Sequence, residues 1–250
     1  MFKYEKKYDL DDPRTTLYHK EIIKNKLFLK KLYISWYQQQ IAYAGKNNFG
    51  KKNLEIGSGG GFLKEVFPDV ITSDILELGC DMTFPGEKMP FENNSLNSVM
   101  MLNVLHHIPD TEGFLKEAFR VLTSGGRIIM IEPANTPFSR FIYKNFHHEP
   151  FLPEAKEWKV DPGNPLSNSN QALPWIVFER DVKIFNEKFP ELKVTEIKYH
   201  TPFAYLISGG VSFKALVPSW SFGIIRGIEK LLSPFSKYIG MFVTIVVEKK

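Results

Sequence analysis

Along the chain, short apolar runs are followed by segments in which apolar residues recur at helical spacing. This pattern predicts strands that alternate with helices. Short apolar runs, typical of buried strands, occur in the middle of the chain and near its end, separated by stretches with helical spacing. The predicted strands are 53–56, 70–73, 97–102, 127–131, 192–199 and 241–248, with a further one near 78–83, and the predicted helices are 60–67, 111–122 and 179–188. Strands that alternate with helices indicate an α/β fold, with a parallel sheet covered by helices on both faces.

The segments outside these strands follow other patterns. Residues 1–48 contain no strand pattern, and apolar residues between Thr15 and Tyr43 recur at helical spacing among lysines, which predicts an N-terminal helical cap of one or two helices. Residues 49–250 would form the main domain. Within it, residues 134–175 are dense in proline, asparagine and aromatic residues and are interpreted as an irregular, lid-like excursion.

Composition narrows the class of protein. With 250 residues and 43% hydrophobic content, the chain can bury one core with a smaller appendage. The single cysteine, Cys80, excludes a disulfide framework, and the opening residues contain no apolar signal-peptide region, so a cytoplasmic location is expected. The net charge of +4 is modest and no basic stripe is visible, so no nucleic-acid partner is expected.

A glycine-rich turn follows the first predicted strand. Residues 53–61 read NLEIGSGGG, and the next apolar run ends on Asp74. Glycines let a ligand approach the backbone closely, because no Cβ stands in the way. A carboxylate at the tip of the neighbouring strand is suited to accept hydrogen bonds from two ribose hydroxyls. Together these features predict a nucleoside-binding site.

Two common nucleotide motifs do not fit this turn. A dinucleotide fingerprint requires a third glycine at position 62, which is Phe62, and a P-loop requires Gly-Lys-Ser/Thr, which is absent after the glycines. The sequence therefore favours a nucleoside cofactor of another kind.

Two later segments identify a family resemblance. Residues 89–110 read MPFENNSLNSVMMLNVLHHIPD and residues 113–133 read GFLKEAFRVLTSGGRIIMIEP. With the glycine turn and Asp74, they resemble the class I S-adenosylmethionine-dependent methyltransferases, in the branch whose fourth strand follows an "LPF…SFD" phrase. The resemblance covers about residues 50–133. It implies a Rossmann-like, seven-stranded, mostly parallel sheet whose last strand is antiparallel, and S-adenosyl-L-methionine as cofactor.

The resemblance also implies which residues bind the cofactor. Asp74 would hold the ribose hydroxyls, and Ile75 would lie against the adenine. The family's polar contact to the adenine amino group would fall at Pro85-Gly86, with Asp81 as an alternative, and Asn97 stands where the family has a structural Asp. The full cofactor set implied is Glu55, Gly57, Ser58, Gly59, Gly61, Asp74, Ile75, Asn103 and Val104.

Methyl transfer from a sulfonium needs alignment of donor and acceptor and exclusion of water, and it needs a general base only when the acceptor must lose a proton. His106 and His107 follow the fourth strand and are candidate bases; alternatively, they belong to a turn before the next helix. Glu132, at the end of the fifth strand, would contact substrate or cap the strand. His147-His148-Glu149 lacks metal-ligand spacing, so no metal is expected.

The late segment 203–238 is strongly apolar, and Pro218 divides it into two short helices. Two interpretations stay open: a peripheral membrane contact, or a helical insertion packed on the N-terminal helices. The sequence thus predicts a methyltransferase that methylates the oxygen of a small-molecule, glycan or lipid-linked acceptor. The alternatives are a catalytically inactive cofactor-binding domain and a methyltransferase for lipids at the membrane surface.

Overall fold

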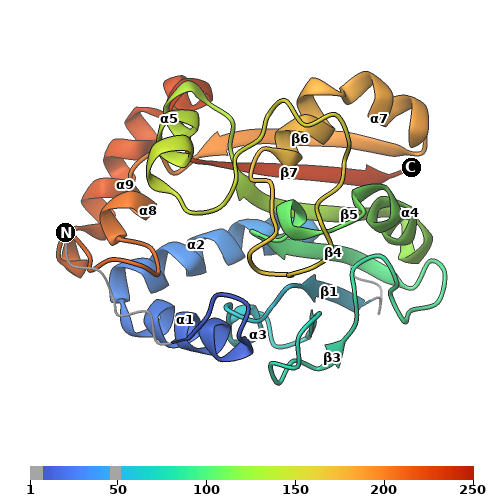
Figure 1. The fold of residues 1–250 in the computed structure, drawn as a ribbon, viewed down its shortest axis with the longest axis horizontal. Helices are drawn as coiled ribbons and strands as arrows, with labels where there is room; N and C mark the ends of the chain where they lie inside the picture. The colour runs from blue at the N-terminus through green and yellow to red at the C-terminus, as the bar shows by residue number, and fades with distance from the viewer. Residues whose placement is uncertain (1–7, 46–51) are drawn as a thin grey trace.

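The computed structural model describes residues 8–45 and 52–250, which form a seven-stranded sheet with strand order β3-β2-β1-β4-β5-β7-β6 (Figure 1). Neighbouring strands from β3 to β5 pair in parallel, whereas β7 pairs antiparallel with both β5 and β6. This confirms the predicted Rossmann-like sheet and its antiparallel last strand. The strands are β1 (Lys52–Ile56), β2 (Val70–Asp74), β3 (Met82–Thr83), β4 (Leu96–Leu102), β5 (Leu122–Pro133), β6 (Leu192–His200) and β7 (Phe242–Lys249).

Helices lie on both sides of the sheet, with α2 behind it and α4 in front in the view of Figure 1. The α-helices are α1 (Pro13–Asn25), α2 (Leu27–Ala44), α3 (Leu63–Val66), α4 (Thr111–Val121), α5 (Pro137–Phe146), α6 (Leu173–Trp175), α7 (Val182–Lys188), α8 (Ala204–Ser208), α9 (Phe222–Leu231) and α10 (Ser236–Ile239). Short 3-10 turns are η1 (Leu105–His107), η3 (Ser219–Ser221) and η4 (Ser233–Phe235), and η2 (Ile176–Arg180) is a π-helix. The central parts of β4 and β5, from Val99 to Met101 and from Ile128 to Ile131, are apolar and buried, as expected of parallel strands covered on both faces.

The N-terminal helices reach across to the glycine turn. Asp12 caps α1 by accepting a hydrogen bond from Arg14 N, and Pro13 occupies the first turn. Tyr37 of α2 is fully buried and packs edge-on against Phe62, with ring centroids 5.1 Å apart. The predicted helices between residues 15 and 43 are therefore α1 and α2. The proposed boundary between residues 48 and 49 lies outside the described residues.

The structure corrects the interpretation of 134–175 as irregular throughout, because residues 137–146 form α5. Thr136 and Ser139 form a capping box: Thr136 Oγ1 accepts from Ser139 N (3.1 Å), and Ser139 Oγ accepts from Thr136 N (2.8 Å). Pro137 occupies the first turn, where its missing N–H costs no hydrogen bond. The polar and proline residues that suggested a loop are thus the start signal of a helix.

Three other predicted elements differ in their limits. The helix predicted at 60–67 is restricted to α3, because Phe62 has a non-helical backbone (φ −148°). The helix predicted at 179–188 is broken near Asp181, where the π-helix η2 gives way to α7. The strand predicted near 78–83 is only the two residues of β3.

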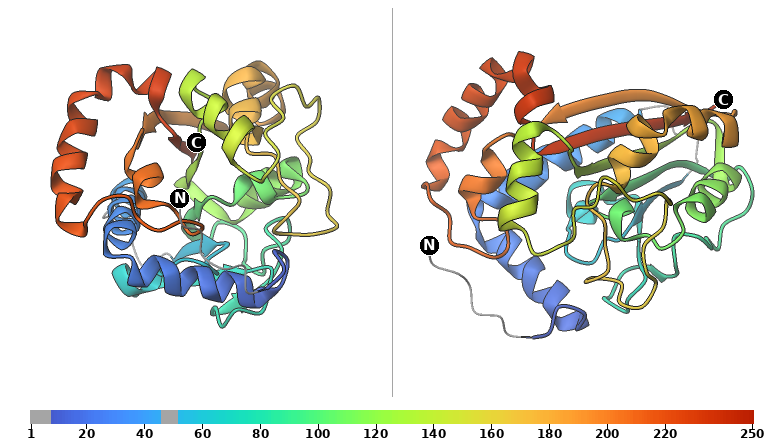
Figure 2. Two further views of the ribbon diagram at one scale, coloured as in Figure 1. Left: turned by 60° about the vertical axis from the view of Figure 1, so that its left-hand side comes forward. Right: turned by 45° about the horizontal axis from the view of Figure 1, so that its top comes forward.

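The late apolar segment lies between β6 and β7 and forms α8, α9 and α10, with Pro218 just before η3 (Figure 2). Phe222 of α9 packs edge-on against Phe28 of α2, with ring centroids 5.2 Å apart. The buried Glu229 carboxylate accepts the N–H groups of Phe203 (2.9 Å) and Ala204 (2.7 Å) and so fixes the start of α8. The segment therefore contains three short α-helices where two were predicted, with Pro218 between α8 and α9. No described helix has both the length and the apolar character required to cross a membrane.

Candidate active site

A cavity of about 340 Å³ opens at the carboxyl ends of β1, β2 and β4, where ligands bind in open α/β sheets. Its floor is formed by the glycine turn and the ends of these strands. Helices α1 and α2 and the segment around residues 161–166 form its walls. The predicted site residues that line it are Glu55, Gly57, Gly61, Asp74, Ile75, Asn103, Val104 and His107.

The glycine turn is closely packed against the protein itself. Gly57 has a φ of +70°, and a Cβ there would lie 2.4 Å from Val104 Cγ2. A Cβ on Gly61 would lie 2.6 Å from the Tyr37 hydroxyl, and one on Gly59 would lie 2.8 Å from Asp74 Oδ2. The glycines therefore allow the turn to approach β4, β2 and helix α2, in addition to leaving the backbone open toward the cavity.

Asp74 ends β2 with its carboxylate held in place. Oδ2 accepts the N–H of Gly59 (3.0 Å), and Oδ1 accepts the N–H of Leu76 (2.9 Å). Burial raises the pKa of this carboxyl. Each carboxylate oxygen can accept a further hydrogen bond, so both can receive hydroxyl donors from the cavity. Ile75, 48% exposed, follows at the rim.

Two further cavity residues carry buried polar atoms without a partner among the described residues. They are Oε2 of Glu55 and Oδ1 of Asn103. Asn103 has a φ of +57°, an uncommon backbone conformation that tends to occur at functional sites. Burial raises the pKa of the Glu55 carboxyl to about 7. A buried polar atom normally has a hydrogen-bond partner, so these two atoms indicate a ligand with donor groups.

The two adjacent histidines have different surroundings. His106 is buried, and its Nδ1 lies 2.6 Å from Glu132 Oε2. Burial alone would lower the pKa of His106, but the carboxylates of Glu132 and Glu149 outweigh it and raise the pKa to about 9. His107 lines the cavity, and burial together with the neighbouring His106 charge lowers its pKa to about 4.

Glu132 caps the turn that contains these histidines. It is fully buried, and its Oε1 accepts the N–H groups of Val104 (2.9 Å) and Leu105 (2.8 Å). Of the two roles considered for Glu132, the structure thus supports the structural one. The carboxylate fixes η1 at the end of β4 and holds the His106 ring at the same time.

Comparisons with known proteins agree with this geometry. A family model described as "Methyltransferase domain" matches residues 54–130. A demethylmenaquinone methyltransferase of Symbiobacterium thermophilum is 34% identical over 119 residues, which cover 44% of this chain and 44% of that protein. The chain carries a class I S-adenosylmethionine-dependent methyltransferase domain. It spans less than half the length of the curated relatives that it matches.

Solved structures share the fold of this chain over nearly its whole length. A SAM-dependent methyltransferase of Thermotoga maritima is 17% identical with a TM-score of 0.51, covering 95% of this chain and 94% of that one. Geranyl diphosphate C-methyltransferase of Streptomyces coelicolor, solved with Mg²⁺, geranyl diphosphate and S-adenosyl-L-homocysteine, is 14% identical with a TM-score of 0.50, covering 96% and 87%. At these identities the likeness concerns the fold.

The methyltransferase's own residues fit S-adenosylmethionine. The Asp74 carboxylate can accept from both ribose hydroxyls, and the unpartnered atoms of Glu55 and Asn103 match a ligand that carries an ammonium group. The backbone at Gly57 and Gly61 borders the same space. When bound, the cofactor supplies a methyl group on a positively charged sulfur.

Two residues considered for the cofactor are occupied elsewhere in the protein. Ser58 is buried outside the cavity lining, and its N–H donates to Ser73 O (2.9 Å). Asp81 accepts from Thr72 N and Thr72 Oγ1 (both 2.9 Å) and forms an ion pair with Lys64. Asp81 thus ties the loop before β3 to β2, and the cavity wall near Pro85-Gly86 is formed by Phe84, Gly86 and Glu87 instead.

Several residues of the methyltransferase cavity carry no motif in the sequence. They come from the N-terminal helices, from the segment 161–166 and from the late insertion, and they include Thr16, His19, Tyr33, Tyr37, Leu166, Tyr205 and Val211. The predicted N-terminal cap and lid-like excursion 134–175 pointed to the first two of these regions, whereas the contribution of the late insertion to the cavity was not predicted. Which residues of those flanks face the cavity depends on tertiary packing.

Glu55 gives the protein a pH-dependent stability. The pKa of its carboxyl is about 7 in the folded protein, against 4.5 as the model-peptide value. A raised pKa means that ionisation opposes folding, so the stability cost begins above pH 4.5, grows up to pH 7 and is complete above it. Glu55→Gln removes this ionisation. It should raise the free energy of unfolding by about 3 kcal/mol at pH 8 and by about 1 kcal/mol at pH 5.

Thermal or urea unfolding at the two pH values measures this difference. Glu77→Gln, which removes an exposed carboxylate from the loop after β2, is the control and should change little at either pH. An equal effect of Glu55→Gln at pH 5 and pH 8 would contradict the raised pKa of the Glu55 carboxyl.

Proposed function

We propose that this protein transfers a methyl group from S-adenosylmethionine to a hydroxyl oxygen of an apolar, lipid-like small molecule. The observation that carries the proposal is the composition of the cavity. Polar side chains lie at the strand ends, at Glu55, Asp74 and Asn103, and the other walls combine apolar side chains with a few polar ones such as Glu87 and Asp161. One end thus suits a nucleoside cofactor and the other suits an apolar acceptor.

The apolar walls favour a lipid-like acceptor over a glycan. A glycan would require many hydrogen-bonding groups, whereas the walls away from the strand ends supply more aliphatic, proline and aromatic side chains than polar ones. These include Ile23, Phe84, Ile108, Pro109, Pro162, Leu166 and Val211. The relative from Symbiobacterium, which is named for demethylmenaquinone, offers a quinone as the first acceptor to test.

The protein's contribution to the reaction is alignment and exclusion of water. Asp74, Glu55 and Asn103 would fix the donor, and helices α1 and α2 with the segment 161–166 would close the space around the acceptor. Of the two histidines predicted as candidate bases, His107 lines the cavity and His106 is buried behind it. We therefore assign the contact with the acceptor hydroxyl to His107.

The outer face of the late insertion supports delivery of the acceptor from a membrane surface. Large apolar side chains recur along η3, α9 and η4 and are exposed, from 44% at Ile228 to 80% at Leu231. They are Trp220, Ile224, Ile228, Leu231 and Phe235, and we call them the apolar stripe. Figure 2 shows α9 at the outer edge of the molecule in both views.

The inner side of α9 combines apolar and charged side chains, since Phe222 and Ile225 also pack against the core. Glu229 is buried and forms an ion pair with Arg226, while the apolar stripe faces outward. Lys230 and Lys237 lie among the stripe residues in the sequence, as in helices that bind anionic membrane surfaces. The segment thus combines the two roles considered for it. One side of α9 packs on α2, and we propose that the other side contacts lipid.

One experiment tests donor, acceptor and membrane contact together. The protein is incubated with methyl-labelled S-adenosylmethionine and either reduced demethylmenaquinone or a total lipid extract, in detergent or in phosphatidylcholine vesicles containing phosphatidylglycerol. Label should enter the lipid fraction in both settings. Replacing Trp220 and Leu231 by Ser should reduce transfer in vesicles by about tenfold or more and leave transfer in detergent unchanged, because two buried apolar contacts with lipid are lost.

Each other outcome overturns a defined part of the proposal. Label in a polar extract alone would exclude the lipid-like acceptor, and binding of the cofactor without transfer to any fraction would identify a cofactor-binding module. Equal transfer by the variant in vesicles would exclude the membrane contact. If the wild type were a dimer in solution and the variant a monomer, the apolar stripe would instead contact a second copy of the chain. Carbon NMR of the labelled product separates an O-methyl from the C-methyl product named for the Streptomyces enzyme.

A further inference from the structure

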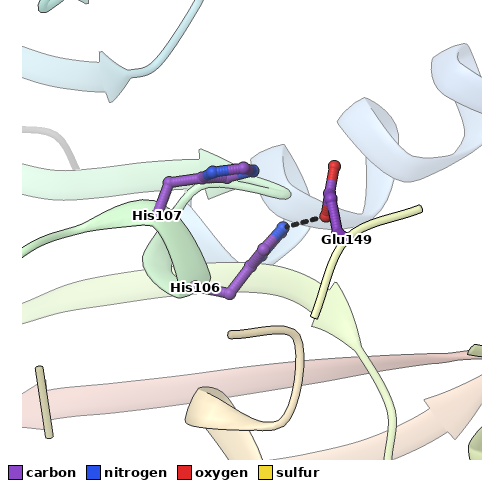
Figure 3. Close-up of side chains that lie close together, drawn as sticks. All are labelled: His106, His107 and Glu149. Atoms are coloured by element: carbon purple, nitrogen blue, oxygen red, sulfur yellow. Dashed lines mark ion pairs between the residues drawn. The ribbon is translucent and has the colours of Figure 1, made fainter. Parts of the chain in front are cut away.

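Three potential metal ligands from distant parts of the sequence meet at the cavity wall. His106 and His107 come from η1 after β4, and Glu149 comes from the loop after α5. One ligand atom of each lies within 4.8 Å of the other two. Figure 3 shows the three side chains close together, with the His106 ring directed at the Glu149 carboxylate. In the sequence, Glu149 follows two histidines at a spacing that is not typical of metal ligands. In the fold, Glu149 lies instead beside His106 and His107.

His106 Nδ1 is engaged by a carboxylate, so Nε2 is the ring nitrogen that can bind either a proton or a metal ion. Its Nδ1 lies 2.6 Å from Glu132 Oε2, and Glu132 Oε1 already accepts two backbone N–H groups. Glu132 therefore acts as an acceptor throughout, and His106 Nδ1 carries the hydrogen. A carboxylate that holds Nδ1 in this way commonly orients a histidine that binds metal through Nε2.

His106 Nε2 faces Glu149 Oε2 at 3.4 Å. This contact is favourable when a cation lies between the imidazole nitrogen and the carboxylate oxygen: a proton in the metal-free protein, which a metal ion can replace. Zinc bonds of about 2.1 Å place neighbouring tetrahedral ligands about 3.4 Å apart, so this separation suits a shared ion.

In His107, as in His106, an oxygen that accepts a hydrogen bond lies next to Nδ1. Its Nδ1 lies 3.3 Å from the backbone carbonyl of Asn168, which can only accept. Nδ1 thus carries the hydrogen and Nε2 keeps its lone pair. Because His107 lines the cavity, an ion held by Nε2 would border the space proposed for the acceptor.

The third ligand, Glu149, is held in place by residues at the end of the segment that follows it. Glu149 Oε2 accepts the side-chain N–H of Gln171 (2.9 Å), and the N–H of Asn170 donates to the backbone oxygen of His106 (2.9 Å). These bonds fix the loop against η1 without an ion. The fold therefore holds the three ligands near one another, and their widest separation, within 4.8 Å, must shorten for all three to bind one zinc ion.

We propose that His106, His107 and Glu149 bind a zinc ion at the wall of the cavity. Two imidazoles and one carboxylate form the donor set of catalytic zinc sites, which keep a fourth position open. Magnesium prefers oxygen ligands and octahedral geometry, so this set disfavours it. The open position lies on the cavity side.

The ion would also define how the acceptor is activated, and this part rests on the proposed function. An acceptor hydroxyl at the fourth position would lose its proton to solvent more readily, because the cation stabilises the oxyanion. The oxygen would then form its bond to the methyl carbon as the carbon–sulfur bond breaks, and the electron pair would leave on sulfur. His107 would act as a metal ligand and would not take up the proton.

Zinc titration of the EDTA-dialysed protein tests the site without any acceptor. Calorimetry should show one zinc ion per chain and much weaker binding of magnesium, and cobalt should give the intense visible bands of a tetrahedral site. His107→Ala and Glu149→Gln should each weaken zinc binding by about 100-fold or more, since even outer residues contribute 10–100-fold. Gln171→Ala, a milder change, should weaken it about tenfold.

His148→Ala is the matched control, because His148 is exposed and adjacent to Glu149 but outside the ligand set. It should leave zinc affinity unchanged. Zinc binding that is absent, or that survives His107→Ala, Glu149→Gln and Gln171→Ala, would show that a proton alone bridges His106 and Glu149. Methyl transfer by the zinc-free protein would then leave the proposed function standing without the metal.

Discussion

Replacing Asp74 with alanine is expected to weaken S-adenosylmethionine binding by about 100-fold. The carboxylate lies at the end of β2 with each oxygen already accepting one backbone N–H, and its remaining lone pairs face the cavity. Two hydrogen bonds from ribose hydroxyls to a charged acceptor together account for about 3 kcal/mol or more, which corresponds to this change in affinity. Isothermal titration calorimetry measures the change.

Asp74 also accepts a hydrogen bond from Gly59, so its loss could weaken cofactor binding indirectly by loosening the glycine turn. Further variants separate this indirect effect from the loss of the ribose contact. Asp74→Asn keeps the size of the side chain and one acceptor oxygen, so its affinity should fall between those of the wild type and Asp74→Ala. Glu77→Ala removes an exposed carboxylate from the same loop and should bind the cofactor normally. Unchanged affinity of a folded Asp74→Ala protein would refute the assigned ribose contact.

Replacing Glu132 with alanine should lower the free energy of unfolding by about 3–5 kcal/mol, a large part of the usual 5–15 kcal/mol. The carboxylate is fully buried and accepts from Val104 N, Leu105 N and His106 Nδ1. Its removal leaves buried donors unpaired and the His106 ring without its partner. A fall in melting temperature of about 10 °C or more should follow.

Glu132→Gln tests the contribution of charge separately from that of shape. The amide keeps an oxygen for the N–H groups of Val104 and Leu105, so the loss of stability should be smaller than in Glu132→Ala. Glu92→Ala, at an exposed position, should change stability by no more than about 0.5 kcal/mol. If Glu132→Ala melted like the wild type, the capping role of Glu132 would be wrong.

The predictions for the sheet succeeded because each strand leaves a local mark. A buried parallel strand is a short continuous apolar run, and the run at 97–102 and its neighbours were visible without knowledge of the fold. The glycine turn and Asp74 are also local signals, because φ > 0 at Gly57 and a carboxylate at a strand end are properties of single positions. Helix α5 was missed because Thr136-Pro137 is typical both of a loop and of a helix start.

The histidine cluster shows where sequence reasoning ends. His106 and His107 were identified as candidates, but their neighbours Glu132 and Glu149 are distant in sequence, and only packing decides which imidazole is buried and which lines the cavity. Likewise, no pattern in 222–231 reveals that the carboxylate of Glu229 is buried and fixes the start of α8.

The sequence by itself therefore determined the methyltransferase-type sheet, the cofactor turn and the ribose carboxylate, because periodicity, glycine conformations and strand ends are encoded residue by residue. The tertiary structure alone decided that Tyr37 packs beneath the glycine turn, that Glu149 joins the two histidines, and that the apolar stripe faces outward. Contacts of this kind depend on how flanking segments fold back over the sheet, and the free energy of that packing is shared among residues far apart in the chain.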